Sequence, residues 1–392
     1  MNPVSTVTAN RPRFDHLDGL RGIAAFSVMV GHIRWPSAIA GLPSFHNTSL
    51  WVDFFFVLSG FVIAHAYFGK ISSGMSVATF MGRRFARLYP LHLLMLFAAL
   101  AYEIIKFKFF GKLEVNVNNA PFDTNNLSAF LSHLVLVQAM GLFPDVTWNG
   151  PSWSISVEFY TYLLFAVLVA MGRARKILFW VGLVSLQLVS LIVLATCTRG
   201  AFLSVETDYG FFRCVLGFGM GVIVRHLYAS STTPVSPASR DWLKALLAAV
   251  ILALIAGPTY KTPVTLVAPF LFAAFIWVMV KHRGGWVEKL LHSRVCQWLG
   301  TLSFSIYMIH SVVRYAFLNV WRLGHRHAPF DGGWGATFLG EALTMSYVGL
   351  VLALAWFSYR MVEVPAQRWL NRLLDRRTPS VREEKPAALA AA

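Results

Sequence analysis

An arginine and a histidine share one face of an otherwise apolar segment near the start of the chain. The segment reads LDGLRGIAAFSVMVGHI, and ten residues separate Arg21 from His32. In an α-helix, eleven steps return to within ~20° of the starting direction and rise ~16 Å. Ionisable groups inside a bilayer are costly and normally face a polar path. We therefore expect Arg21 and His32 to line one cavity at opposite depths, with His32 as a base.

A second group of arginines follows in the run RRFARLYP, ahead of the third apolar stretch. The planar guanidinium fork suits phosphate and stays charged. For Arg83 we prefer a role in orientation or lipid-headgroup contact. Arg84 and Arg87, together with Arg21, predict a bound polyanion. Asp18, three residues before Arg21, is either a helix neighbour at this site or a plain neutralising partner.

The remaining candidates lie toward the opposite depth. A carboxylate and a histidine at equal depth are the natural parts of a general base and its orienting partner, so we expect Glu158 to support His32. The other candidates each have a structural alternative. They are Asp53 (a helix start), Ser59 with Gly60 (close helix packing), Trp153 with Trp148 (an interfacial aromatic belt), Ser154 (a helix start) and His310 (core packing).

The composition is that of a membrane protein. Of 392 residues, 56% are hydrophobic and 13% charged, and the mean hydropathy is +0.58; a soluble domain carries about twice that charged fraction. Lys and Arg outnumber Asp and Glu by 34 to 18. We assign this excess to cytoplasmic loops, where basic residues fix orientation. The expectation is an all-α, polytopic protein of the lipid bilayer with no nucleic-acid partner.

About ten apolar stretches approach the ~20 residues that a spanning helix needs. They are 17–34, 50–68, 90–106, 153–171, 177–196, 211–228, 242–258, 264–281, 298–319 and 337–360. An eleventh stretch, 128–143, is shorter and carries His133 and Gln138. If it does not span, the large basic clusters fall on the inner side, as the positive-inside rule requires. We therefore predict a re-entrant or surface segment there, with both termini cytoplasmic.

The expected organisation is one membrane domain between two short ends. We expect a cytoplasmic segment at 1–16, the membrane domain at 17–365 and a cytoplasmic tail at 366–392, disordered from 378. Residues 229–240 read as a flexible cytoplasmic loop. The polar N-terminus lacks the apolar core of a cleavable signal peptide. No nucleophile elbow, phosphate-cradling glycine loop or His/Cys metal motif is visible, and Cys197, Cys214 and Cys296 lack metal or redox spacing. We expect no metal and no resident cofactor.

In combination, these motifs resemble the integral-membrane acyltransferase-3 family, over residues 14–365. The matching runs are LDGLRGIAAFSVMVGH, FFFVLSGFVI, RRFARLYP, PSWSISVEFY, LSFSIYMIH and VEVPAQRW. The resemblance implies the family's Arg/His pair at Arg21 and His32, its second arginine motif at Arg84 and Arg87, and its helix-entry residues at Trp153 and Glu158. It also implies an acyl-coenzyme A co-substrate, most simply acetyl-coenzyme A, and an inner bacterial membrane.

The resemblance and the depth of the polar residues lead to one expected reaction. The arginines bind the donor from inside, and the acyl group reaches a hydroxyl of a carbohydrate or glycolipid outside, such as a lipopolysaccharide or another polysaccharide. His32 acts as base or acyl carrier, and Trp153 walls the acceptor site. A transporter or flippase of an anionic or glycolipid substrate is the alternative. A scaffold without chemistry leaves the buried ionisable residues unexplained.

Overall fold

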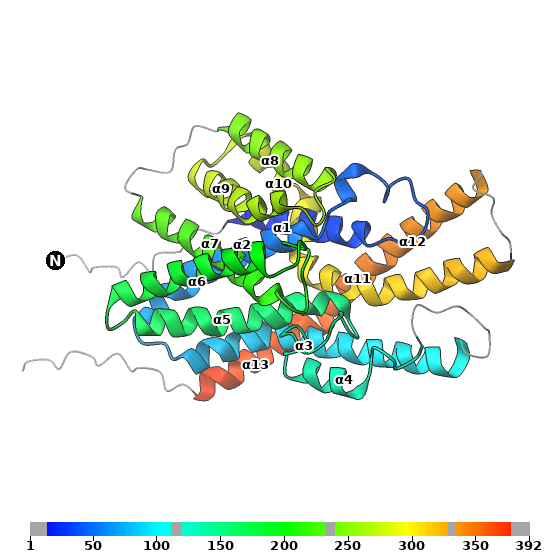
Figure 1. Cartoon of the computed structure of the whole chain (residues 1–392), viewed down its shortest axis with the longest axis horizontal. Coiled ribbons are helices and arrows are strands. Elements are labelled where there is room, and N and C mark those ends of the chain that lie inside the picture. The colour runs from blue at the N-terminus through cyan, green and yellow to red at the C-terminus, as the bar shows by residue number, and fades with distance from the viewer. Residues whose placement is uncertain (1–13, 111–119, 232–239, 328–333, 378–392) are drawn as a thin grey trace, which may run out of the picture.

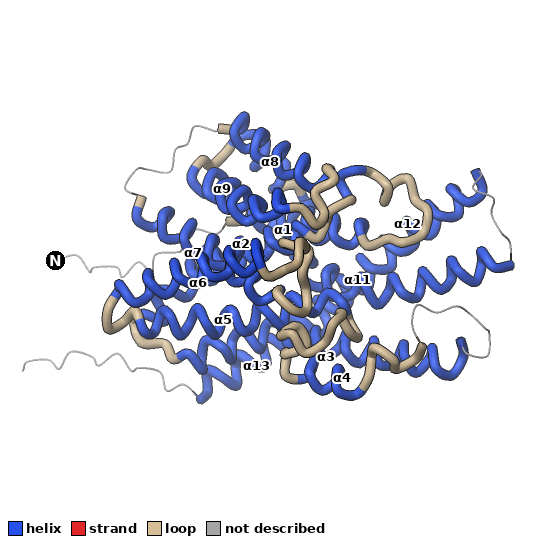
Figure 2. The backbone as a smooth tube through the Cα atoms, in the orientation of Figure 1, coloured by secondary structure: helices blue, strands red, loops and turns tan. Residues whose placement is uncertain are grey.

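The computed structural model describes residues 14–110, 120–231, 240–327 and 334–377. Helices and connecting loops make up this part of the chain, and no strand runs through it (Figure 2). The expected N-terminal segment falls largely, and the disordered tail at 378–392 entirely, outside the described residues, as does most of the loop at 229–240. The expected all-α fold is confirmed for the part described.

The helices follow one another along the chain as α1 Asp15–Gly31, α2 Leu50–Ser72, α3 Val77–Ile105, α4 Leu127–Leu134, α5 Trp153–Met171, α6 Lys176–Thr196, α7 Gly210–Ser230, α8 Asp241–Ala256, α9 Ala268–Lys281, α10 Gly285–Leu291, α11 Arg294–His327, α12 Trp334–Ser358 and α13 Val364–Arg377. Short 3₁₀ turns lie at Pro43–Phe45, Gly150–Ser152 and Pro263–Val267, and π-helical turns at Lys106–Phe110 and Tyr359–Glu363.

Each of the ten apolar stretches lies mostly within a helix, and seven helical segments of the described chain are long and apolar enough to cross a membrane. The long helices run roughly side by side, and the start of α1, the turn between α5 and α6, and the end of α13 lie toward one end of the bundle (Figure 1, left). The α11–α12 hairpin and the end of α3 extend at the other.

Glycines let α2 and α7 pack backbone to backbone in the centre of the bundle. A Cβ on Gly60 would lie 1.9 Å from the Phe218 carbonyl oxygen, and one on Gly221 would lie 1.9 Å from that of Val57. Small residues at such crossings give the close approach that drives helix association in lipid. The packing role considered for Gly60 is therefore confirmed.

Helix α1 is held against α11 by the same device. A Cβ on Gly22 would lie 2.5 Å from the Gly300 amide nitrogen, and one on Gly300 would lie 2.2 Å from the Asp18 carbonyl oxygen. Gln297 adds hydrogen bonds from its Nε2 to the carbonyls of Asp15 and Leu291, both at 2.8 Å. These contacts fix the helix that carries Arg21.

The third helix begins earlier than expected. It starts at Val77, so Arg83, Arg84 and Arg87 lie on the helix itself and not ahead of it. Pro90 lies inside the helix. A proline removes one backbone hydrogen bond, and neighbouring helices in a bundle compensate for the loss. The consequence is that the three arginines project from a rigid element.

Residues 128–143 do not form a spanning helix. Helix α4 has eight residues, about 12 Å at 1.5 Å per residue against a hydrocarbon core of ~30 Å. His133 is buried, with its Nε2 2.9 Å from the Thr147 hydroxyl, and Gln138 donates to the Ser152 carbonyl at 3.0 Å. The polar side chains thus tie the segment to neighbouring loops, as the prediction of a non-spanning segment requires.

The first part of the expected C-terminal tail is a helix. Residues 364–377 form α13, which packs along α3 (Figure 1). Leu374 lies over Gly82, and Asp375 accepts a 2.7 Å hydrogen bond from Arg83. These contacts hold the described part of the tail against the helix that carries the arginines.

Candidate active site

A cavity of about 230 Å³ lies between α1, α2, α3, α5 and α11. Six of the candidate residues from the sequence line it, and the rest of its wall is mostly apolar. The six are Arg21, Ser59, Arg84, Arg87, Ser154 and Glu158. Three guanidinium groups facing one cavity make it a site for an anion.

Arg21 and Arg84 each make one side-chain hydrogen bond within the protein. Arg21 donates to Asp18 at 3.1 Å, and both side chains are partly exposed. Arg84 donates to the Tyr67 hydroxyl at 2.8 Å, and its guanidinium lies 4.8 Å from the centre of that ring. Each keeps further N–H donors for a ligand, since a guanidinium has five.

The third arginine is fixed by the turn between α12 and α13. Arg87 donates to Glu363 Oε1, and Glu363 Oε2 accepts a 2.8 Å hydrogen bond from Ser305. Glu363 is 2% exposed. Arg83, by contrast, pairs with the exposed Asp375 and does not line the cavity. The sequence-based distinction between Arg83 and the other arginines therefore agrees with the structure.

The carboxylate in the cavity belongs to a small hydrogen-bonded group. Glu158 Oε1 accepts from the Tyr162 hydroxyl at 2.6 Å, and that hydroxyl lies 2.8 Å from Ser59 Oγ. Arg84 and Arg21 are the charges that act on Glu158. The carboxylate thus balances part of the positive charge of the site.

His32 lies at the end of α1, next to His310 on α11. Their ring centres are 5.0 Å apart. His32 Nδ1 donates to the Val28 carbonyl and His310 Nδ1 donates to the Tyr307 carbonyl, both at 2.7 Å. A carbonyl can only accept, so each ring carries its proton on Nδ1 and presents a free lone pair on Nε2. His310 Nε2 is buried without a hydrogen-bond partner.

Tyr307 connects the cavity with the two histidines. Its side chain lines the cavity, and its ring centre lies 5.9 Å from that of His310. Ser154 is in hydrogen-bonding contact with the same tyrosine. Consecutive contacts therefore run from the arginine-lined cavity through Tyr307 and His310 to His32.

Asp53 and Trp153 belong to a buried ion pair beside the cavity. Arg213 donates to Asp53 Oδ1 at 2.9 Å and to Oδ2 at 2.7 Å. Trp153 covers the pair, with its ring 5.3 Å from the guanidinium. Asp53 is 0% exposed and Arg213 1%. The group is structural, because it joins α2, α5 and α7 and leaves no face open to a ligand.

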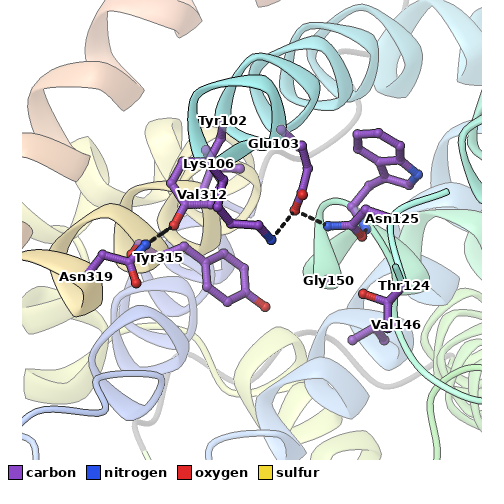
Figure 3. Close-up of a pocket in the computed structure, with 12 residues that line it drawn as sticks. Tyr102, Glu103, Lys106, Thr124, Asn125, Val146, Gly150, Val312, Tyr315 and Asn319 are labelled. Carbon is purple, nitrogen blue, oxygen red and sulfur yellow. Dashed lines mark hydrogen bonds and ion pairs between the residues drawn. The ribbon is translucent and has the colours of Figure 1, made fainter. Parts of the chain in front are cut away.

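A second cavity, of about 100 Å³, lies between the far ends of α3 and α11 (Figure 3). Glu103 Oε1 accepts from Lys106 at 2.8 Å and from Asn125 at 2.7 Å, and Asn319 donates to Tyr102. These polar groups point at one another across the cavity (Figure 3). They tie the loop that carries Asn125 to the bundle.

Comparison with known proteins identifies the family. The family described as "Acyltransferase domain" matches residues 14–360. The chain belongs to the acyltransferase-3 family. It is therefore a membrane acyltransferase of a family that includes O-acetyltransferases.

Curated relatives of this acyltransferase-3 member differ in how much of their own length the match covers. "Acyltransferase MdmB" of Streptomyces mycarofaciens is 28% identical over 96% of both chains. "Peptidoglycan O-acetyltransferase OatA" of Listeria monocytogenes is 23% identical over 81% of this chain and 53% of its own length. "Putative peptidoglycan O-acetyltransferase YrhL" of Bacillus subtilis is 25% identical over 75% of this chain and 47% of its own. The chain thus spans about half the length of the two peptidoglycan relatives. No solved structure matches it.

The structure places two expected site residues of this acyltransferase-3 member with other partners than the sequence suggested. Glu158 hydrogen-bonds Tyr162 and lines the arginine-lined cavity, whereas His310 is the residue beside His32. Trp153 is 5% exposed, covers Arg213 and does not line this cavity. A residue and its fifth successor on a helix face different directions, which separates Trp153 from Glu158.

Four residues of the site were missed: Arg213, Glu363, Tyr162 and Tyr307. Arg213 carried the same signal as Arg21, an arginine inside an apolar stretch. Glu363 belongs to the run VEVPAQRW, just after the apolar stretch 337–360. A carboxylate at the edge of a membrane segment is common, so it gave no signal. The two tyrosines gave no signal, because aromatic residues make up 15% of the chain.

Proposed function

We propose that the protein transfers an acyl group, in the simplest case acetyl, from acyl-coenzyme A to a hydroxyl of a carbohydrate or glycolipid. The proposal that acyl-coenzyme A is the donor rests on the cavity lined by Arg21, Arg84 and Arg87. Three permanent cations are suited to the phosphates of a nucleotide donor. Glu158 lines the same cavity, and Arg84 and Arg21 interact with it electrostatically.

The transfer step is assigned to His32. Its Nε2 lone pair takes the proton of the acceptor hydroxyl, and the acceptor oxygen forms a bond to the thioester carbonyl carbon. The carbon–sulfur bond then breaks, and the coenzyme A thiolate leaves and takes up a proton. The Nδ1 hydrogen bond to Val28 supports this role, because it fixes the tautomer whose Nε2 is a base.

The path from the cavity to His32 is proposed to run past Tyr307. Its ring borders both the cavity and His310. The pantetheine arm of the donor would lie along this side of α11, with the thioester at the level of His32. His310 then contributes a second Nε2 acceptor close to the reacting hydroxyl.

The orientation is proposed from charge. The arginine-bearing start of α3, the α5–α6 turn with Arg173, Arg175 and Lys176, and the basic α13 lie at one end of the bundle (Figure 1). Basic ends favour the cytoplasm, which is where acyl-coenzyme A is made available. We place the protein in a bacterial inner membrane with both termini cytoplasmic and the acceptor outside.

The test is acyl transfer by purified protein in lipid nanodiscs. Labelled acetyl-coenzyme A is supplied with soluble glycan fragments, and free coenzyme A and acetylated glycan are measured together. We expect one acetylated hydroxyl for each coenzyme A released, and neither product with His32→Ala. Coenzyme A release at the same rate without any acceptor, or glycan acetylation by the variant, contradicts the assignment.

A further inference from the structure

Three side chains with metal-binding atoms meet where α1, α10 and α11 join, away from the arginine-lined cavity. They are His16 on α1, Glu288 on α10 and His292 just after α10. One ligand atom of each lies within 4.8 Å of the other two. Sequence inspection found no metal motif because His16 is far from the other two in the chain.

His16 is the observation that needs an explanation. It is 0% exposed, and neither of its ring nitrogens makes a hydrogen bond. Its Nδ1 lies 3.4 Å from Glu288 Oε1. A buried polar group without a partner is destabilising unless something satisfies it. A cation between the imidazole and the carboxylate would do so.

The other two ligands are already oriented by hydrogen bonds to the backbone. His292 Nδ1 donates to the Glu288 carbonyl at 2.7 Å, which leaves its Nε2 lone pair free. Glu288 Oε2 accepts from the Gly284 amide, which leaves Oε1 facing His16. Outer contacts of this kind are what orient the ligands of protein metal sites.

The frame around the three residues is rigid. A Cβ on Gly19 would lie 2.4 Å from the Leu291 carbonyl oxygen, so α1 and the end of α10 touch through their backbones. His292 is exposed. Arg283, His292 and Lys244 are the basic groups that act on His16, and Lys244 is bound to the Gly284 carbonyl at 2.7 Å and to Asp241 at 3.3 Å.

We propose that His16, Glu288 and His292 bind one zinc-like divalent ion, with water in the fourth position. Two imidazoles and one carboxylate form a common three-ligand set for zinc. The exposed side of His292 gives the ion access from solvent. The ion would fasten α10 to the start of α1, five residues before Arg21, and so stabilise this end of the bundle. The site is independent of the donor and acceptor assignments.

The test is metal content of the full-length protein, purified with a tag that contains no histidine. Samples are stripped with a chelator, loaded with zinc, dialysed and measured by mass spectrometry. We expect one equivalent in the wild type and a loss of at least about tenfold in affinity in His292→Ala and Glu288→Gln. His46→Ala, an exposed histidine elsewhere, is the matched control and should keep its zinc.

Two further readouts keep the proposal falsifiable if a variant folds poorly. Zinc should raise the melting temperature of the wild type and not that of His292→Ala, whose exposed side chain can be removed without opening the core. Co²⁺ in place of zinc should give the strong visible absorption of a tetrahedral site. A wild type that keeps no zinc after dialysis, or equal zinc in His292→Ala and His46→Ala, overturns the site.

Discussion

Arg213 on α7 grips both carboxylate oxygens of Asp53 on α2, in a place where neither side chain reaches solvent. The same guanidinium donates to the carbonyls of Val205 at 3.1 Å and Ser49 at 2.8 Å. Each of the three guanidinium nitrogens and both carboxylate oxygens therefore has a hydrogen-bond partner. Such a pair is strongly destabilising to break, although it need not add much stability as a whole.

Asp53→Asn should therefore destabilise the protein by ~3–5 kcal/mol, because Arg213 is left as a buried charge without its counterion. Thermal unfolding in detergent measures the effect. The exposed Arg83–Asp375 pair supplies the control, and Asp375→Asn should cost at most ~1 kcal/mol. Equal effects of the two substitutions would mean that Asp53 is not held by its charge.

The base assignment predicts that His32→Ala lowers turnover by ~10²–10⁴-fold. Coenzyme A binding should stay nearly unchanged, because His32 does not line the cavity. Isothermal titration and a turnover assay on the same sample separate the two effects. His46→Ala, at an exposed position, should leave both unchanged. If His32→Ala turns over like the wild type, His32 is not the base.

The donor site predicts a difference between full and truncated donors. Arg84→Ala and Arg87→Ala should each weaken binding of acetyl-coenzyme A, with much less effect on a donor without the nucleotide phosphates. The lysine variants should recover only part of the loss, since lysine keeps the charge but not the fork. Arg83→Ala should match the wild type with both donors. Equal losses with both donors would show that these arginines do not bind phosphate.

The position of Glu363 leads to a separate prediction. Glu363→Gln should lower acetyl-coenzyme A affinity as Arg87→Ala does, because it removes the charged partner that holds Arg87. A double-mutant cycle of the two substitutions should give a coupling of ~0.5–3 kcal/mol, as for other residues in contact. Additive effects would contradict the coupling.

The topology predicts that 120–126 and 141–149 lie on the same side of the membrane. Single cysteines at Asp123 and Asp145, both exposed, should react with the same impermeant reagent, and one at the exposed Ala174 only from the opposite side. The natural cysteines are first replaced. Labelling of Asp123 and Asp145 from opposite sides would require that α4 crosses.

The sequence was a good guide to helices and to the arginines, and a poor one to pairings. Apolar length and charge located the helices. A spanning segment needs about 20 apolar residues with few charges, and in lipid it must pair its own backbone groups, which favours a helix. Arg21 was found because charge in an apolar segment is costly, and Arg84 and Arg87 were found because clustered guanidinium groups suit a polyanion. The partner of Asp53 is 160 residues away, and the partner of Arg87 is 276 away. Such distances are set by helix packing, which no local pattern records.

The start of the third helix shows what apolar length alone misses. The apolar stretch suggested a start at residue 90, but the helix begins at Val77, and its first turns carry the arginines. Glu158 was assigned to His32 by depth alone. Each step along α5 changes both the depth of a residue in the membrane and the direction of its side chain. The side chain of Glu158 points toward Tyr162 and accepts a hydrogen bond from it.

Arg21 stands on α1 and His32 caps its end, and α11 contacts that helix closely through glycines. The span between them, ~16 Å of helical rise, is therefore fixed. On the proposed function, the fixed spacing of Arg21 and His32 selects the length of the donor. The phosphates and the thioester of a suitable donor are separated by that span. A donor analogue with its pantetheine arm lengthened by one methylene should still bind, yet present its carbonyl out of register with the histidine.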